Sequence, residues 1–202
     1  MNTRQHSLPV DLQACAQALL LRPEDSHKYD FGRVLVIGGC RAMAGAPALA
    51  GMAALRAGAG VVEIAVPESI ATTVAGFNPC LIVHALAEDA EGGFAAESLS
   101  GWQSLAQRAD VLVLGPGMGR ATHLEQAVLA LWQTFPRTLL VDADGLFALA
   151  SLPAEVLARP PGPRILTPHT GEMRRLSGSA PMQRTALEVE ARSIVDDLMD
   201  EF

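Results

Sequence analysis

The chain has 202 residues, of which 50% are hydrophobic and 18% are charged, so it is long and apolar enough for one α/β domain with a substantial core. Its net charge of -7, without a run of lysines and arginines, disfavours a nucleic-acid-binding or anionic-membrane surface. Three scattered cysteines, Cys15, Cys40 and Cys80, are too few for a disulfide framework or a zinc site and fit a reducing cytoplasm. Residues 1–21 lack the pattern of a secretory signal, and we expect no membrane span.

Apolar residues alternate between strand-like runs and helical spacing along most of the chain. In chain order, this predicts a helix at residues 12–21, a strand at 33–39, a helix at 46–59, a strand at 61–66, a helix at 68–75, a strand at 81–86, a helix at 96–108, a strand at 111–115, a helix at 122–131, a strand at 138–141, a helix at 146–152, a short strand at 165–166, a helical turn at 173–176 and an amphipathic helix at 182–202. The acidic, glycine-containing residues 88–94 predict an exposed loop.

Strands that alternate with helices at this repeat length indicate βαβ units. We therefore expect a three-layer α/β fold, with a mainly parallel sheet and helices on both faces. In such sheets, ligands bind beyond the carboxyl ends of the strands. A candidate site is thus expected where several strand ends carry unusual residues.

Four predicted strand ends carry glycines or ionisable groups. They are Gly38 and Gly39 with residues 44–46, the glycine turn (residues 115–119, GPGMG), Asp142 with Asp144, and residues 168–172 (PHTGE). The glycine turn matches neither GxxxxGK[ST] nor GxGxxG, which disfavours a P-loop NTPase and a Rossmann dehydrogenase. Bare backbone amides there allow a phosphate to approach closely, although tight βα connections use glycine for purely structural reasons too.

The ionisable residues at these strand ends have two interpretations each. Asp142 and Asp144 are suited to orienting a ribose or a metal-bound water, and equally to capping a helix. Glu172 fits a first-turn helix acid better than a base. His27 and Lys28 could reach a phosphate, but an exposed loop pair is the simpler interpretation.

Five segments in this order resemble the ADP/ATP-dependent NAD(P)H-hydrate dehydratase family of the ribokinase-like superfamily: HKYDFGRVLVIGG, MAGAPALAGMAALRAGAGVV, VLGPGMG, LLVDADGL and ILTPHTGEMRRLSG. The resemblance runs from about His27 to about Arg192. It implies a partial ribokinase-like domain at residues 27–202, incomplete at its C-terminus, and the residue pattern predicts an N-terminal helix and loop at residues 1–26 before it. The resemblance also implies a homo-oligomer.

The resemblance implies a metabolite-repair enzyme that dehydrates the (S)-forms of hydrated NADH and NADPH, written NADHX and NADPHX. ADP or ATP would phosphorylate the added hydroxyl, with Mg²⁺ stabilising the transferred charge, and phosphate would then be eliminated. It places the hydrated dinucleotide against Ala46, Gly117 and His169. Ala46 and Gly117 leave room for close approach, and His169 offers a hydrogen bond. The alternative for His169 is a loop histidine that caps the following helix.

The sequence departs from the family pattern in two ways. Family members continue beyond residues 182–202 into a lysine-glycine segment that holds the adenine nucleotide and a GTGD-like turn whose aspartate is the expected base. No residue here matches that aspartate, so we expect it to lie beyond the chain end and assign no catalytic residue. Within the matched part, Tyr29 stands where a small residue is common, Ala42 where a glycine is common and Phe147 where an asparagine is common, and these three changes are expected to alter the shape of the pocket. A truncated, non-catalytic dinucleotide-binding module and another ribokinase-like small-molecule kinase remain alternatives.

Overall fold

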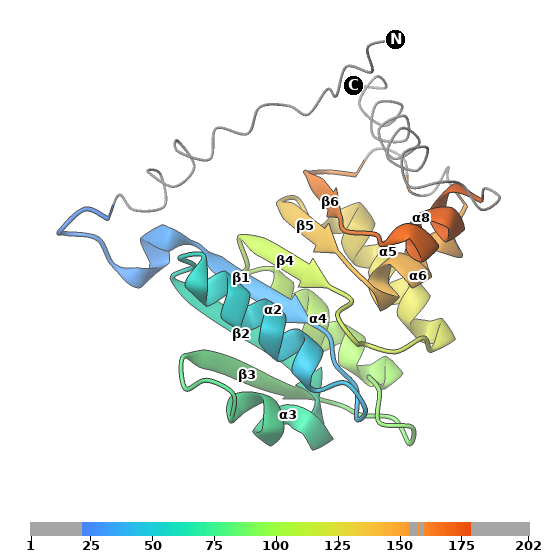
Figure 1. Cartoon of the computed structure of the whole chain (residues 1–202), viewed down its shortest axis with the longest axis horizontal. Helices are drawn as coiled ribbons and strands as arrows, with labels where there is room; N and C mark the ends of the chain where they lie inside the picture. Colours follow the sequence, from blue (N-terminus) through green and yellow to red (C-terminus); the bar gives the residue numbers. More distant parts are fainter. Residues whose placement is uncertain (1–21, 154–156, 158–159, 179–202) are drawn as a thin grey trace, which may run out of the picture.

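A computed structural model describes residues 22–153, 157 and 160–178. The domain is built on one sheet with the strand order β3-β2-β1-β4-β5-β6, in which every neighbouring pair is parallel (Figure 1). The strands are β1 (Arg33–Ile37), β2 (Val61–Pro67), β3 (Leu81–Leu86), β4 (Val111–Leu114), β5 (Thr138–Val141) and β6 (Arg164–Leu166). The predicted α/β class is confirmed, while the helices predicted at residues 12–21 and 182–202 lie outside the described residues.

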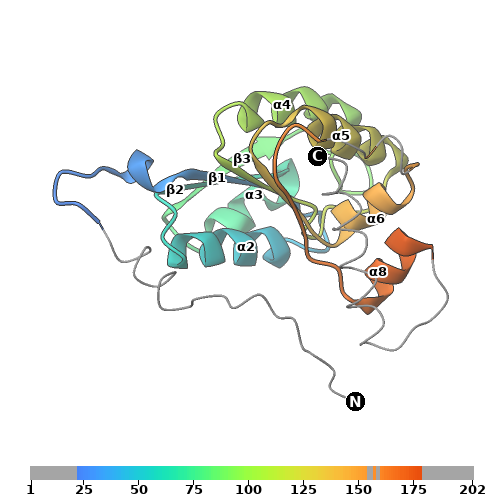
Figure 2. The ribbon, with the colours of Figure 1, turned by 90° about the horizontal axis from the view of Figure 1, so that it is seen from above.

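Helices connect the strands and cover both faces of the sheet. They are η1 (Lys28–Phe31), α2 (Gly45–Arg56), α3 (Glu68–Ala75), η2 (Ala96–Ser98), α4 (Leu99–Ala106), α5 (Thr122–Thr134), α6 (Asp144–Ala150) and α8 (Thr170–Ser177). Helices α4 and α5 lie on one side of the sheet and α2 on the other (Figure 2). None of the described helices has the length and apolar character needed to cross a membrane.

Successive residues of β1 point to opposite faces, and this alternation builds two hydrophobic cores. Leu35 and Ile37 join the core beneath α4 and α5. Val36 joins the core beneath α2 and α3. Because both faces of the central strands are covered, their sequences are nearly continuous apolar runs rather than alternating patterns.

Two helices begin two or three residues earlier than the apolar periodicity predicts, while α3 and α5 begin where predicted. α6 begins at Asp144 rather than residue 146, and α8 begins at Thr170 rather than residue 173. The first turn of a helix carries polar residues that satisfy its free N–H groups, so it does not contribute to the apolar stripe. The helix predicted at residues 96–108 divides into η2 and α4.

The prediction of an exposed loop at residues 88–94 is wrong at its end. Phe94 is completely buried, and its ring packs edge-on against Trp102 of α4 with 4.9 Å between the ring centroids. Glu88 and Phe94 also form an isolated antiparallel bridge. A single aromatic residue inside an acidic segment has no periodicity, so its burial could not be predicted from the pattern.

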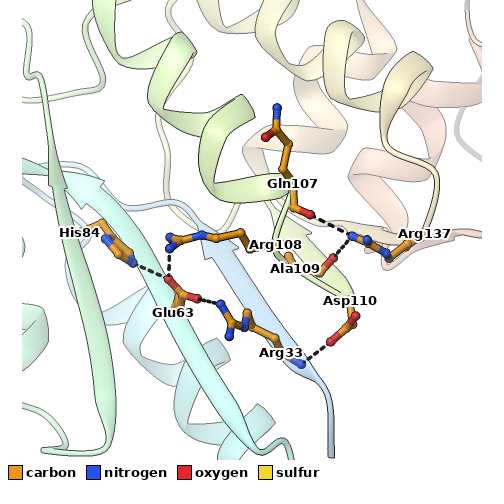
Figure 3. Close-up of polar contacts among 8 residues, drawn as sticks. All are labelled: Arg33, Glu63, His84, Gln107, Arg108, Ala109, Asp110 and Arg137. Carbon is orange, nitrogen blue, oxygen red and sulfur yellow. Dashed lines mark hydrogen bonds and ion pairs between the residues drawn. The ribbon is translucent and has the colours of Figure 1, made fainter. Parts of the chain in front are cut away.

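A buried carboxylate joins β1, β2, β3 and the end of α4. Glu63 of β2 is 6% exposed, and its two oxygens contact His84 Nε2 at 2.6 Å, Arg108 Nη2 at 3.3 Å and Arg33 Nη1 at 3.4 Å (Figure 3). The backbone N–H of Arg33 donates to Asp110 at 2.8 Å, which ties the start of β1 to the start of β4. This network lies toward the amino ends of the strands, away from the edge where ligands are expected.

Arg164, at the start of the edge strand β6, binds the C-terminal end of α5. Burial lowers the pKa of Arg164 to about 10, so the guanidinium still carries its charge at neutral pH. Its Nη2 donates to the carbonyls of Trp132 at 2.5 Å and Phe135 at 2.8 Å, at the end of α5. A cation at a helix C-terminus satisfies the free carbonyls and complements the helix dipole. The edge strand β6 is thereby fastened to α5.

Candidate functional site at the carboxyl edge of the sheet

The glycine turn packs directly against the start of α2. Gly117 has φ 65°, and a Cβ placed on it would lie 3.2 Å from the Cβ of Ala46 and 2.9 Å from the Cβ of Met43. A hydrogen bond also joins the loop after β1 to the glycine turn after β4, because the N–H of Gly39 donates to the carbonyl of Pro116 at 2.8 Å. Two of the three predicted site residues, Ala46 and Gly117, are therefore neighbours in space although 71 positions separate them in the sequence.

The β5–α6 junction is equally tight and holds an unusual backbone conformation. Ala143 has φ 49° and ψ -115°, a region that L-residues rarely adopt. The N–H of Gly145 donates to the carbonyl of Asp142 at 2.9 Å and closes the turn. The strained residue thus stands between the two predicted acidic residues, just beyond the carboxyl end of β5.

Asp142 and Asp144 connect turns rather than cap α6. No side chain caps the N-terminus of α6, whose N-cap is Ala143. Asp144 is 8% exposed and accepts from the N–H of Gly119 at 3.1 Å and from Nε of Arg120 at 2.9 Å. Asp142 accepts from the hydroxyl of Thr167 at 2.8 Å. Asp144 therefore fixes the end of the glycine turn, and Asp142 links β5 to the end of β6.

His169 caps α8. Its Nδ1 accepts from the N–H of Gly171 at 2.9 Å and of Glu172 at 3.3 Å, and Glu172 in return accepts from the N–H of His169 at 2.9 Å. Such a reciprocal capping box satisfies three free N–H groups of the first turn. Because Nδ1 is an acceptor, the ring proton lies on Nε2, which is 3.3 Å from a Glu172 oxygen. His169 thus has the capping role that the sequence left open as the alternative to ligand binding, and the predicted first-turn position of Glu172 is confirmed.

The capping arrangement leaves the outer side of the His169 ring open, since the side chain is 71% exposed. In the sheet order, only β5 separates β6 from β4, so His169 follows a strand two spacings, or roughly 10 Å, from the glycine turn. The three predicted site residues therefore share one edge of the sheet. His27 and Lys28 do not, because they belong to η1 and its cap just before the amino end of β1.

Arg41, in the loop before α2, is anchored by Glu88. Glu88 accepts from Arg41 Nη2 at 2.6 Å and from the N–H of Ser69, in the first turn of α3, at 2.7 Å. The hydrogen bonds from Ser69, and then those from Arg41, hold the pKa of Glu88 below its ordinary value of 4.5. The segment mispredicted as a free loop thus positions the loop that leads to Ala46.

The edge has few groups that could hold a metal ion. Among the described residues, no three His, Cys, Asp or Glu side chains are arranged to bind one. Asp142, at the carboxyl end of β5, makes no ion pair with the described residues, although it accepts from the hydroxyl of Thr167. Mg²⁺ is commonly bound by one or two carboxylates together with substrate phosphates. The edge therefore fits a magnesium ion that arrives with a nucleotide.

Three residues near the glycine turn were not predicted from the sequence as site residues. The guanidinium of Arg120 stacks on the ring of Phe147, and so does the guanidinium of Arg175. Arg120 directly follows the glycine turn, Phe147 belongs to α6 and Arg175 belongs to α8. The sequence signals were an arginine next to the glycines and an aromatic residue in a position where the family often has asparagine, but neither signal reveals the contact.

Comparisons with known proteins agree with this architecture. A model of the NAD(P)H-hydrate dehydratase family matches residues 34–199. The bifunctional NAD(P)H-hydrate repair enzyme Nnr of Salinibacter ruber is 41% identical over 158 residues, which are 78% of this chain and 29% of that protein. The chain thus spans about a third of the length of such curated relatives.

Two solved structures show the same fold. A ribokinase-like superfamily protein of Enterococcus faecalis matches with a TM-score of 0.63 and 26% identity, over 78% of this chain and 52% of that one. The ADP/ATP-dependent NAD(P)H-hydrate dehydratase of Bacillus subtilis, co-crystallised with ATP and Mg²⁺, matches with a TM-score of 0.61 and 29% identity, over 80% of this chain and 53% of that one. With its fold, its sheet-edge motifs and the family match over most of its length, the chain belongs to the NAD(P)H-hydrate dehydratase family.

Proposed function

We propose that the chain acts in nicotinamide nucleotide repair, by binding (S)-NADHX or (S)-NADPHX for dehydration to NADH or NADPH at the expense of ADP or ATP. The observation that carries this proposal is the direct packing of Gly117 on Ala46 at the carboxyl edge. A glycine and an alanine in contact leave backbone, rather than bulky side chains, facing a ligand at this point. Membership of the NAD(P)H-hydrate dehydratase family indicates that this ligand is a hydrated nicotinamide dinucleotide.

Each of the three residues has a defined task in this proposal. Gly117 and Ala46 leave space for close approach of the dinucleotide. His169 donates from Nε2, and its ring orientation is set in advance because Nδ1 is engaged by the helix N-terminus. A donor that is already oriented loses less entropy when it binds a ligand.

The reaction needs a leaving group better than hydroxide. The hydroxyl of the hydrated ring would attack the terminal phosphoryl group of the nucleotide, and phosphate would then depart as a proton is lost from the neighbouring carbon. Mg²⁺, carried by the nucleotide, would neutralise the charge on the transferred phosphoryl group. In this proposal Asp142 would be the carboxylate that contacts it. No described residue is assigned as the base.

The decisive experiment follows the absorbance of reduced nicotinamide when the purified chain meets NADHX with Mg²⁺ and either ADP or ATP. Regain of the absorbance that depends on the nucleotide supports the proposal. Gly117→Val should abolish the regain, because its side chain would clash with Met43 and Ala46 at the binding surface. Gly119→Val is the matched control, because Gly119 also has a positive φ but open space around its Cβ position.

The alternative from a different functional class is a non-catalytic module that binds the dinucleotide. It is favoured if the folded chain binds NADH, with weaker binding by Gly117→Val, yet shows no nucleotide-dependent regain. A folded chain that neither binds NADH nor acts on NADHX contradicts both proposals. We further propose a cytoplasmic location and a homo-oligomer, the latter to be tested by light scattering of the purified chain.

A further inference from the structure

Two arginines converge on one aromatic ring beside the glycine turn. The Cζ of Arg120 lies 4.5 Å from the ring centroid of Phe147, and the Cζ of Arg175 lies 5.0 Å from the same centroid. The two guanidinium groups are therefore less than about 10 Å apart, although the residues are 55 positions apart in the sequence. The stack brings together the end of the glycine turn, α6 and α8.

The charges in this cluster are not balanced within the described part of the chain. Arg120 pairs with Asp144, through Nε and at a distance of 2.9 Å, and its two terminal nitrogens have no partner there. Arg175 makes no ion pair and no hydrogen bond with a described residue. The cluster thus holds two guanidinium groups within about 10 Å of each other and one carboxylate, Asp144, which pairs with Arg120 alone; two cations at this separation repel each other unless an anion joins them.

Phe147 gives both guanidinium groups a defined position. Long arginine side chains at a surface are otherwise free to rotate, and ordering them costs conformational entropy. Because contact with the ring already restricts the two side chains, less conformational entropy is lost when a ligand binds. The N–H edges of each guanidinium plane stay free to donate. An asparagine at position 147 would offer no ring for such a stack.

We propose that Arg120 and Arg175, positioned by Phe147, form a binding site for a phosphate group of the ligand that occupies this edge of the sheet. Guanidinium groups recognise phosphate oxygens through paired hydrogen bonds, and a separation below about 10 Å lets one phosphate or diphosphate contact both. The source of the phosphate rests on the proposed function. It is either the dinucleotide, through its diphosphate or the 2′-phosphate of NADPH, or the nucleotide co-substrate.

The test measures Kd by calorimetry for inorganic diphosphate, NADH, NADPH and ADP with the full chain, at low ionic strength where charge contacts are least screened. Arg175→Gln should weaken diphosphate binding about tenfold, which corresponds to the loss of a charge-assisted hydrogen bond. Arg174→Gln is the matched control. It makes the same charge change on the neighbouring residue of α8, whose Nε donates to the carbonyl of Thr170 and which is not stacked on Phe147.

Phe147→Asn tests the stack without changing the charge, and it should weaken diphosphate binding about threefold while circular dichroism confirms the fold. Equal affinities of wild type and Arg175→Gln for diphosphate, or equal losses in the Arg174→Gln and Arg175→Gln variants, overturn the proposal, as does absence of diphosphate binding by the folded wild type. If Arg175→Gln weakens NADPH binding more than NADH binding, the 2′-phosphate is the source; equal losses indicate the dinucleotide diphosphate, and a loss with ADP alone indicates the nucleotide. Because diphosphate binding requires no turnover, these outcomes are independent of the NADHX assay.

Discussion

Gly115 and Gly145 meet backbone to backbone where β4 and α6 come together. A Cβ on Gly115 would lie 2.5 Å from the nitrogen of Gly145, and a Cβ on Gly145 would lie 2.7 Å from the carbonyl oxygen of Leu114. Neither distance is compatible with a side chain, because the opposing atoms belong to the backbone and cannot rotate away. Gly115, the first residue of the glycine turn, can thus lie against the first turn of α6 only because neither Gly115 nor Gly145 has a side chain.

Gly145→Ala should lower the free energy of unfolding by about 3 kcal/mol or more, because the methyl group forces the β4 and α6 backbones apart. Urea denaturation measures the change. Gly119→Ala is the control, with a positive φ of 83° but no atom within 4 Å of its Cβ position. It should cost only about 1–2 kcal/mol of backbone strain. Equal decreases in the free energy of unfolding of the two variants would show that the close contact between β4 and α6 does not contribute to stability.

Ala143→Gly should leave the stability unchanged or raise it by up to about 1 kcal/mol. Glycine adopts the φ of 49° without the steric cost of a Cβ, and this gain outweighs its larger entropy in the unfolded chain. Thermal unfolding measures the difference. The same substitution at Ala150, the last residue of α6, should instead destabilise by up to about 0.5 kcal/mol. A loss at position 143 that matches the loss at position 150 would argue against strain at the β5–α6 junction.

Glu63→Gln should destabilise the domain by about 2–4 kcal/mol. The substitution leaves the guanidinium groups of Arg33 and Arg108 around a buried site without a countercharge, and breaking a buried ion pair costs more than the pair itself contributes. Chemical denaturation tests the value. Glu91→Gln removes the same charge from an exposed position and should change the stability by less than about 0.5 kcal/mol. Indistinguishable effects of the two substitutions would contradict a structural role for the Glu63 network.

Stability should fall in acid partly through Glu88. Its pKa in the folded chain is held below 4.5 by the hydrogen bonds from Ser69 and Arg41, so the ionised form stabilises the fold above the ordinary pKa. This contribution disappears as the pH falls below 4.5 and through the lowered pKa of the folded chain. Unfolding free energies of wild type and Glu88→Gln should therefore differ at pH 7 and converge in acid, once the pH is below that lowered pKa. A gap that stays constant over this range would exclude the linkage.

His169→Asn should separate capping from ligand binding. Asparagine is a good N-cap residue, so α8 should keep its stability to within about 0.5 kcal/mol, whereas His169→Ala should lose about 1 kcal/mol. Both variants lack the imidazole Nε2 donor, and both should bind NADH more weakly in a fluorescence titration of the reduced nicotinamide. NADH affinity that stays at the wild-type level in His169→Asn would limit His169 to its role as a cap.

The sequence predicted those features of the site that lie within a single segment. The VLVL run and the glycines after it were enough to predict a buried strand and a tight turn, and TPHTGE was enough to predict a capped helix start. Such features depend on local backbone preferences and on the hydrogen bonds of neighbouring residues. The order of the motifs also indicated the family.

Only the tertiary structure decided which of these segments touch. The strand order places β4 between β1 and β5, and this brings Gly117 to Ala46 and Gly115 to Gly145. The burial of Phe94, the partners of Glu63 and the two arginines on Phe147 likewise depend on residues that are far apart in the chain. A sequence pattern records how often apolar residues recur, whereas these contacts depend on how strands are ordered and how helices pack across them. The amino-acid sequence by itself therefore determined the class of fold and the candidate edge, and packing between distant segments determined the shape and the charge of the site.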